Sequence, residues 1–156
     1  MAAERYIAVI GSGDAPAEIR TLALAVGREI AVNGAILVCG GLGGVMEAAA
    51  QGAREVGGHT IGILPSHDRK TANRFIEFAI PTGIGEARNA IVIGSADAAI
   101  ALAGGEGGTL AEIGFALKLK RPVVALRAWS EISGLHRANN PADAVSLALR
   151  LIDGRS

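Results

Sequence analysis

The sequence predicts an α/β fold: a single doubly wound domain over residues 1–156, with a mostly parallel sheet of about six or seven strands and helices on both faces. Three observations support this class. Short apolar segments alternate with longer helical segments along the whole chain. The short segments show no regular polar alternation, as expected of strands buried on both faces. Glycine clusters follow three of them, at the edge where such sheets bind ligands.

The expected strands are short and apolar, and most are followed by glycine or polar residues. They cover residues 5–10, 35–39, 59–65, 75–82, 97–103 and 122–126. The expected helices carry apolar residues at helical spacing, and two begin at a proline, Pro16 and Pro141. They cover residues 16–32, 45–56, 86–96, 109–120 and 141–154. We expect residues 66–74 to form a polar loop, either solvated or covering a ligand, and residues 127–140 to be irregular.

Charge and composition exclude several classes of partner. With 15 basic and 15 acidic residues, the chain has no overall field that would attract nucleic acid or an anionic membrane. Cys39 is the one cysteine, so we expect no disulfide and no metal site, and a small buried side chain rather than a reactive thiol. The sequence contains neither a signal peptide nor the roughly 20 apolar residues of a membrane span. We therefore expect a cytoplasmic protein.

Three glycine clusters stand at the predicted carboxyl ends of strands: Gly11–Gly13, Gly40–Gly44 and Gly104–Thr109. The second and third lead directly into predicted helices, whose first turns leave unpaired N–H groups and a partial positive charge. Glycine also lets a ligand approach the backbone closely. The clusters therefore predict a cradle for a phosphate or another anion. The alternative is that glycine only turns the chain between strand and helix, but three clusters at one edge favour a ligand site.

Two common nucleotide-binding motifs do not fit these clusters. A Walker loop requires a Gly-Lys pair, and the chain contains none. A dinucleotide fingerprint requires G-x-G-x-x-G and an acidic residue at the end of the second strand. Here the first cluster continues with Asp14-Ala15-Pro16, and the second strand ends at Cys39-Gly40. The sequence therefore argues against an NAD site.

Arg88 and Glu112 are the candidate chemical groups at this edge. A guanidinium near a helix start can hold a phosphate or carboxylate through two hydrogen bonds. The Glu112 carboxylate, one turn after Thr109, could activate water or stabilise an oxocarbenium-like centre. The other interpretation is structural. In that case Glu112 offsets the helix dipole, by at most about 1 kcal/mol, and Arg88 is its surface partner.

Three stretches of the sequence, residues 40–53, 87–105 and 106–124, resemble the LOG superfamily of Rossmann-like proteins, which are often mislabelled as lysine decarboxylases. The resemblance extends from about residue 5 to residue 126. It implies a Rossmann-like fold and one of two functions. Plant and microbial members are phosphoribohydrolases that cut an adenosine monophosphate derivative into base and ribose 5-phosphate. Other members bind nucleotides, and one group carries the molybdenum cofactor, a phosphate-bearing pterin.

The superfamily hallmark, Pro-Gly-Gly-x-Gly-Thr-x-x-Glu, aligns with residues 104–112 without a gap. Gly108, Thr109 and Glu112 match it, and Arg88 matches the arginine of an Arg-Lys pair that precedes it. The resemblance therefore implies that Glu112 has the position of the catalytic glutamate and that Arg88 contacts the nucleotide.

Three positions depart from the hallmark. Gly104 replaces the proline, Glu106 replaces the second glycine, and Asn89 replaces the lysine. The changes place an acid in the phosphate loop and remove a cation. They favour the shorter branch of the superfamily, which contains the molybdenum-cofactor carriers, and they leave the role of Glu106 open.

Two main hypotheses follow. In the first, the chain is a binding protein for a phosphate-bearing nucleotide or a molybdenum-cofactor-type pterin. In the second, it is a phosphoribohydrolase with Arg88 and Glu112 as catalytic residues. A scaffold whose site has decayed is the third interpretation. The candidate ligand-binding residues are Gly11, Ser12, Gly13, Gly41, Gly43, Gly44, Met46, Arg88, Asn89, Gly105, Gly107, Gly108, Thr109 and Glu112.

A homodimer or homotetramer is also expected. The alanine-rich segments at residues 45–53 and 89–101 carry more apolar surface than a small monomer needs to bury. The resemblance points the same way, because members of the superfamily form dimers or larger assemblies.

Overall fold

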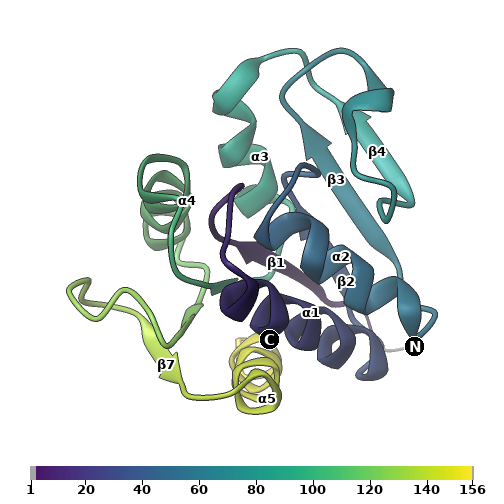
Figure 1. Cartoon of the computed structure of the whole chain (residues 1–156). Coiled ribbons are helices and arrows are strands. Elements are labelled where there is room, and N and C mark those ends of the chain that lie inside the picture. The colour runs from purple at the N-terminus through teal and green to yellow at the C-terminus, as the bar shows by residue number, and fades with distance from the viewer. Residues whose placement is uncertain (1–2, 156) are drawn as a thin grey trace.

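Over residues 3–155, which the structure describes (Glu106 by its backbone alone), a computed structural model shows one sheet of seven parallel strands (Figure 1). The strand order is β4-β3-β2-β1-β5-β6-β7. The predicted α/β class with a parallel sheet is confirmed. The strands are β1 (Tyr6–Ile10), β2 (Ile36–Cys39), β3 (Thr60–Leu64), β4 (Phe78–Pro81), β5 (Ala98–Ala101), β6 (Val123–Leu126) and β7 (His136–Ala138).

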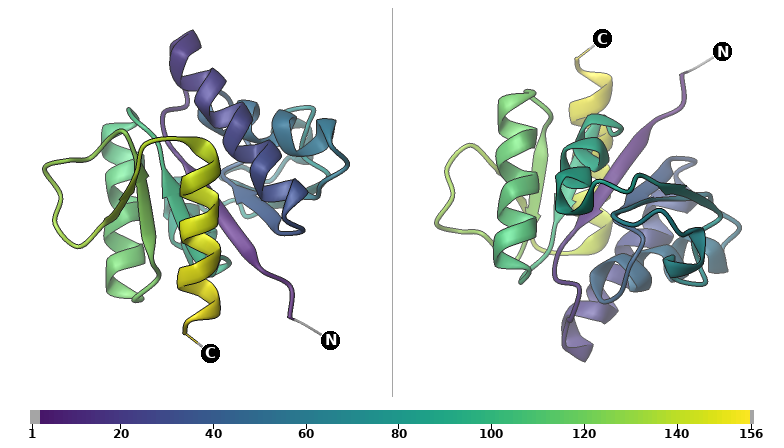
Figure 2. Two further views of the ribbon diagram at one scale, coloured as in Figure 1. Left: turned by 90° about the horizontal axis from the view of Figure 1, so that it is seen from below. Right: turned by 90° about the horizontal axis from the view of Figure 1, so that it is seen from above.

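Helices cover both faces of the sheet, as Figure 2 shows. One apolar cluster joins the sheet to α1, α2 and α5, and a second joins its other face to α3 and α4. The predicted helix over residues 86–96 is a short 3₁₀ turn followed by a short α-helix. The helices are α1 (Ala17–Val32), α2 (Val45–Glu55), α3 (Asn89–Gly94), α4 (Glu106–Lys118) and α5 (Pro141–Asp153), with 3₁₀ turns η1 (Arg69–Thr71) and η2 (Gly85–Arg88).

The direction of winding reverses between β1 and β5, which are neighbours in the middle of the sheet. Ala8 of β1 pairs with Val38 of β2 on one side and with Ala99 of β5 on the other. The chain leaves β1 toward α1 on one face and leaves β5 toward α4 on the opposite face (Figure 2). The loops after β1 and β5 therefore diverge at the carboxyl edge, and doubly wound sheets bind ligands at such a reversal point.

Two elements differ from the sequence prediction. β7 lies within residues 127–140, which were expected to be irregular, and pairs with β6 as an edge strand. Two of its three residues are exposed, so it lacks the apolar run that marks the buried strands. α4 begins at Glu106, three residues before the predicted start at Thr109. Gly107 and Gly108 hide this start, because glycine is about 1 kcal/mol less favourable than alanine in a helix.

Helices α1 and α2 pack closely because glycines remove side chains from their contact. A Cβ on Gly27 would overlap the carbonyl oxygen of Ala49, and a Cβ on Gly52 would overlap that of Leu24. The apolar surface of residues 45–53, which the sequence assigned to an oligomer interface, is largely covered within the chain. The buried alanines of α2 are Ala48, Ala49, Ala50 and Ala53.

We expect Gly52→Ala to lower the free energy of unfolding by about 1–3 kcal/mol, because the added methyl group must displace a backbone carbonyl. Gly114→Ala is the matched control. It also replaces a helix glycine, but a Cβ there would meet no atom within 4 Å. The control should raise the free energy of unfolding by about 0.5–1 kcal/mol through helix propensity. Urea denaturation measures both changes, and equal stability of the two variants would contradict the close packing of α1 and α2.

Candidate functional site

A cleft of about 260 Å³ lies at the carboxyl edge of the sheet, at the reversal between β1 and β5. All three glycine clusters contribute to it, together with η2, the start of α3 and the first two turns of α4. The topology therefore brings together residues that are up to a hundred positions apart in the sequence. Its lining residues are Gly11, Gly13, Leu42, Met46, Glu86, Arg88, Asn89, Gly105, Gly108, Thr109 and Glu112.

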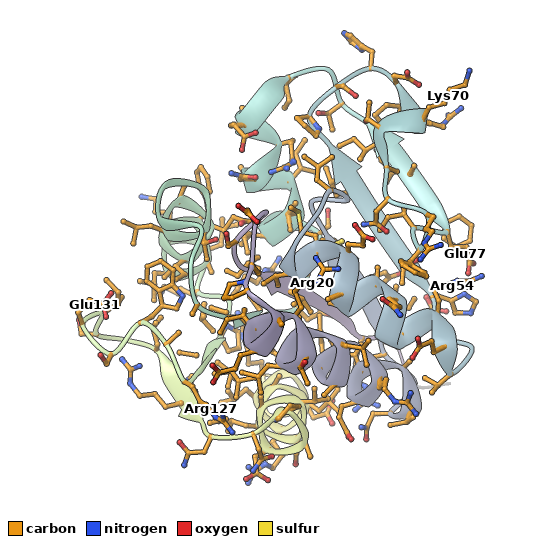
Figure 3. All side chains as sticks on the ribbon, in the orientation of Figure 1. Arg20, Arg54, Lys70, Glu77, Arg127 and Glu131 are labelled. Carbon is orange, nitrogen blue, oxygen red and sulfur yellow. The ribbon has the colours of Figure 1, made fainter. Side chains whose placement is uncertain are left out.

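Most of the predicted site residues line this cleft, and two lining residues, Leu42 and Glu86, were not predicted. Glu86 stands two positions before Arg88 in η2. This closeness to the arginine that matches the superfamily is the sequence feature that could have identified Glu86 as a site residue. The polar loop at residues 66–74 contributes no lining residue. Figure 3 shows Lys70 of that loop at the outer end of the molecule. The predicted residues outside the lining are Ser12, Gly41, Gly43, Gly44 and Gly107.

Several glycines of the site are needed for packing between the loops. A Cβ on Gly44 would overlap the carbonyl oxygen of Ser12. A Cβ on Gly104 would lie 2.8 Å from the Ser12 Cβ, and one on Gly105 would lie 3.0 Å from the carbonyl carbon of Gly11. All three glycines also have positive φ, between 62° and 84°, which favours glycine. The loops after β1, β2 and β5 thus contact one another through their backbones.

A second set of glycines is open. A Cβ on Gly107 would meet no atom within 4 Å, and one on Gly108 would meet only the Asn89 Nδ2, at 3.6 Å. Both residues lie in the first turn of α4, where the N–H groups have no partner within the helix. The Thr109 N–H already donates to the Gly105 carbonyl, at 2.7 Å. The free donors of this helix start therefore belong to residues 106–108, and glycine leaves two of them accessible.

Arg88 is buried beside this helix start and is held by its neighbours. Its exposed fraction is 5%. Its Nη1 donates to the Asn89 Oδ1 and lies 3.7 Å from the Glu86 carboxylate. Its Nη2 lies over Gly40, where a Cβ would approach it to 2.9 Å. The buried Nε–H has no hydrogen-bond partner among the described residues.

Glu112 faces the same cleft from the second turn of α4 and is 8% exposed. Burial raises the pKa of its carboxyl group to about 8. The guanidinium of Arg88 opposes this rise, and the nearby Glu86 carboxylate adds to it. Glu112 is therefore mostly protonated and neutral at pH 7. In this form it does not repel an anionic ligand, and it can donate a hydrogen bond to one.

Cys39 lies beneath the site and is fully buried. Burial raises the pKa of its thiol to about 12, so the thiolate that a reactive cysteine requires is not formed near neutral pH. The Gly41 N–H donates to its sulfur at 3.4 Å. Among the side chains that the structure describes, no group of three or more His, Cys, Asp and Glu residues is placed to hold a metal ion. No helix within residues 3–155 is long and apolar enough to cross a membrane.

The fold and the cleft define a class: a doubly wound α/β protein whose ligand cleft lies where the direction of winding reverses. A family model described as the SLOG cluster4 family matches residues 4–149, and the chain belongs to this family. The resemblance to the LOG superfamily, first seen in the glycine motif and in Arg88, is thereby confirmed.

Three known proteins are similar to the chain over most of its length. The molybdenum cofactor binding protein of Rippkaea orientalis is 36% identical with a TM-score of 0.91, over 96% of this chain and 98% of that one. The molybdenum cofactor carrier protein of Chlamydomonas reinhardtii is 34% identical with a TM-score of 0.88, over 97% and 99% of the two chains. The cytokinin riboside 5'-monophosphate phosphoribohydrolase of Mycobacterium tuberculosis is 36% identical over 129 residues, which are 76% of this chain and 68% of that protein.

The raised pKa of Glu112 predicts a dependence of stability on pH. Between about pH 4.5 and pH 8 the folded chain keeps a proton that the unfolded chain has released, so the stability of the wild type falls as pH rises through this window. The slope is at most about 1.4 kcal/mol per pH unit. Glu112→Gln cannot ionise, so its stability relative to the wild type should increase from pH 5 to pH 8 by about 1 kcal/mol or more.

Urea denaturation at several pH values measures this difference. Glu18→Gln is the control, because this acid is exposed on α1 and lines no part of the cleft, so it should change the profile much less. Parallel pH profiles for the wild type and Glu112→Gln would contradict a protonated, buried Glu112.

Proposed function

We propose that the chain is a binding protein for a phosphate-bearing small molecule, either a nucleotide or a pterin of the molybdenum-cofactor type. The start of α4 is the observation that carries this proposal. Gly107 and Gly108 leave the free N–H groups of this turn without a covering side chain, and Gly108 and Arg88 line the same cleft. Helix starts with exposed amides bind phosphate through these groups and through the helix dipole.

The buried guanidinium supports the same function. An unpartnered buried donor such as the Nε–H of Arg88 costs about 1–3 kcal/mol, and a phosphate oxygen that accepted a hydrogen bond from it would remove this cost. The neutral form of Glu112 also supports anion binding, because it removes a negative charge from the cleft at pH 7. The side chain of Glu106 lies outside the described residues.

The relatives support a pterin as the phosphate-bearing ligand. The proteins of Rippkaea orientalis and Chlamydomonas reinhardtii are named as binding or carrying the molybdenum cofactor, and each aligns with almost the whole chain. The cofactor would be cargo rather than a reagent. In this proposal the first turn of α4 and Arg88 hold its phosphate, and Leu42 and Met46 offer apolar contacts to its ring system.

A phosphoribohydrolase is the alternative, favoured by the pairing of Glu112 and Arg88 at one cleft and by the similarity to the enzyme of Mycobacterium tuberculosis. In that reaction the carboxylate of Glu112 would stabilise the positive charge that develops on the ribose. Two observations weigh against it. Glu112 must first lose a proton at neutral pH, and Asn89 ties Arg88 where the hallmark has a second cation.

The ligand affinity of a variant at Gly108 tests the proposal. The Gly108→Ala variant adds a methyl group to the open helix start, so we expect the affinity for AMP or a molybdopterin phosphate to fall about tenfold or more, which corresponds to about 1.4 kcal/mol. Gly114→Ala is the control on the same helix and should bind like the wild type. Titration calorimetry with AMP, with adenosine and with the pterin measures the effect and its dependence on phosphate.

The same incubations distinguish the alternative and the decayed scaffold. Free adenine that appears with the wild type and is absent with Glu112→Gln would identify a hydrolase. Binding without release of base supports the carrier or sensor. If neither phosphate-bearing compound binds, or if Gly108→Ala binds as tightly as Gly114→Ala, the binding function is contradicted.

We also infer that the chain forms a homodimer or homotetramer. Phe78 and Ile80 on the edge strand β4 are 55% and 46% exposed, and Ile84 and Ile91 near α3 are exposed as well. Ile80 pairs with Ile63, which packs under α3, so the exposed side chains of β4 lie on the α3 face. An edge strand with such side chains favours association.

Light scattering at micromolar concentration measures the assembly. We expect a mass of at least twice the 15.8 kDa of one chain. Phe78→Lys combined with Ile80→Lys should reduce it to one chain, since two charges would have to be buried at the contact. A wild-type mass of one chain, or a mass that the double variant leaves unchanged, would contradict this interface. That the chain binds no nucleic acid stays a prediction from its balanced charge.

A further inference from the structure

The loop between β6 and β7, residues 127–135, lines no part of the cleft, yet it has an unusual conformation. Arg127 and Trp129 have φ values of +54° and +59°. This left-handed region is unfavourable for residues with large side chains, so other contacts must hold the loop. Figure 3 shows the loop extending away from the molecule, with Glu131 at its outer end and Arg127 closer to α5.

Arg137 of β7 provides these contacts. Its guanidinium donates hydrogen bonds to the backbone carbonyls of four loop residues. The shortest go to Ile132, at 2.8 Å, and Trp129, at 2.9 Å. The other two go to Ala128, at 3.2 Å, and Ser130, at 3.4 Å. One side chain therefore closes residues 128–132 into a compact turn, and we call residues 127–137 the strap.

Trp129 connects the strap to the middle of the sheet. Its Nε1–H donates to the carbonyl oxygen of Leu102, at 2.8 Å, and its ring packs against the apolar cluster under α3 and α4. Leu102 is fully buried directly after β5, and its own N–H donates to the carbonyl of Ile10, at 2.9 Å. The residue that follows β5 is therefore fixed by β1 through its N–H and by the strap through its carbonyl.

The position of Leu102 determines where the third glycine cluster begins. Two residues later, Gly104 and Gly105 turn the chain at positive φ into α4, and their backbones lie against Ser12 and Gly11. These turns contain no side chain that could hold them in place. The anchor at Leu102 is therefore the hydrogen-bonded backbone position from which this glycine turn starts.

We propose that Trp129 and Arg137 are positioning residues for the ligand site: the strap holds the end of β5 so that the first turn of α4 faces the cleft. This inference rests on the proposed function and adds to it a role for a segment that lines no part of the site. Without the indole donor, the buried carbonyl of Leu102 loses a partner, and the glycine turn after it gains freedom.

Hydrogen–deuterium exchange tests the strap without any ligand. Trp129→Phe keeps an aromatic ring and removes the N–H donor, and Arg137→Gln loosens the turn from an exposed position. In both variants we expect the hydrogen-bonded amides of the segment 102–109, those of Leu102 and Thr109, to exchange about fivefold faster or more, while those of residues 36–46 stay unchanged. Glu131→Gln, at the exposed tip of the loop, is the control and should leave both segments unchanged.

The dissociation constant for AMP tests the consequence for binding. A purely structural loss of stability lowers the melting temperature but leaves the affinity of the folded protein unchanged. A positioning role predicts an affinity about threefold weaker or more in Trp129→Phe and Arg137→Gln, and wild-type affinity in Glu131→Gln. Unchanged exchange at the amides of Leu102 and Thr109 would overturn the inference, and so would faster exchange with unchanged affinity. If AMP does not bind even the wild type, AMP is not the ligand, and the exchange result alone decides the role of the strap.

Discussion

Backbone-to-backbone packing of three loops is the constraint on which the cleft depends. Because β1 lies between β2 and β5, the loops that follow these strands share one crowded edge of the sheet. Gly44 lies against the carbonyl of Ser12, and Gly105 lies against the backbone of Gly11. A side chain at either glycine would push two loops apart and displace the start of α2 or α4. The loops can meet only because glycine stands at these contacts.

The same contacts separate two roles that the sequence alone does not distinguish. A glycine-rich strand-to-helix loop is expected both where a phosphate approaches the backbone and where two loops approach each other. In this chain Gly44, Gly104 and Gly105 serve the second purpose, and Gly107 and Gly108 are free for the first. Within its nine residues, the hallmark motif of the superfamily therefore contains glycines that pack against another loop, followed by glycines that are open to a ligand.

The side-chain chemistry of the cleft is consistent with holding a ligand. Arg88 is buried and tied to Asn89, and the Glu112 carboxyl is neutral at pH 7 because burial penalises its charge. Catalysis at a developing oxocarbenium ion requires an ionised carboxylate, whereas binding an anion benefits from the absence of negative charge. The substitution of asparagine for the lysine of the hallmark acts in the same direction, since its amide orients the arginine and adds no charge of its own.

The fold class could be predicted because six of the seven strands are short and apolar and leave a local signal. The position of the cleft could be predicted because three glycine clusters end strands that the topology places side by side. The start of α4 could not, since Gly107 and Gly108 resemble a loop in composition. Neither could β7, whose residues are mostly exposed, nor the contact of Trp129 with Leu102, which joins residues 27 positions apart. The segments that hold a site in place are harder to predict from the sequence than the residues of the site itself. A glycine turn has no side chains to hold it, so its geometry must come from neighbouring segments, and these can be of almost any composition. The strap illustrates the principle: one guanidinium, one indole and a buried carbonyl connect the edge of the sheet at β7 to the segment that leads from β5 into α4.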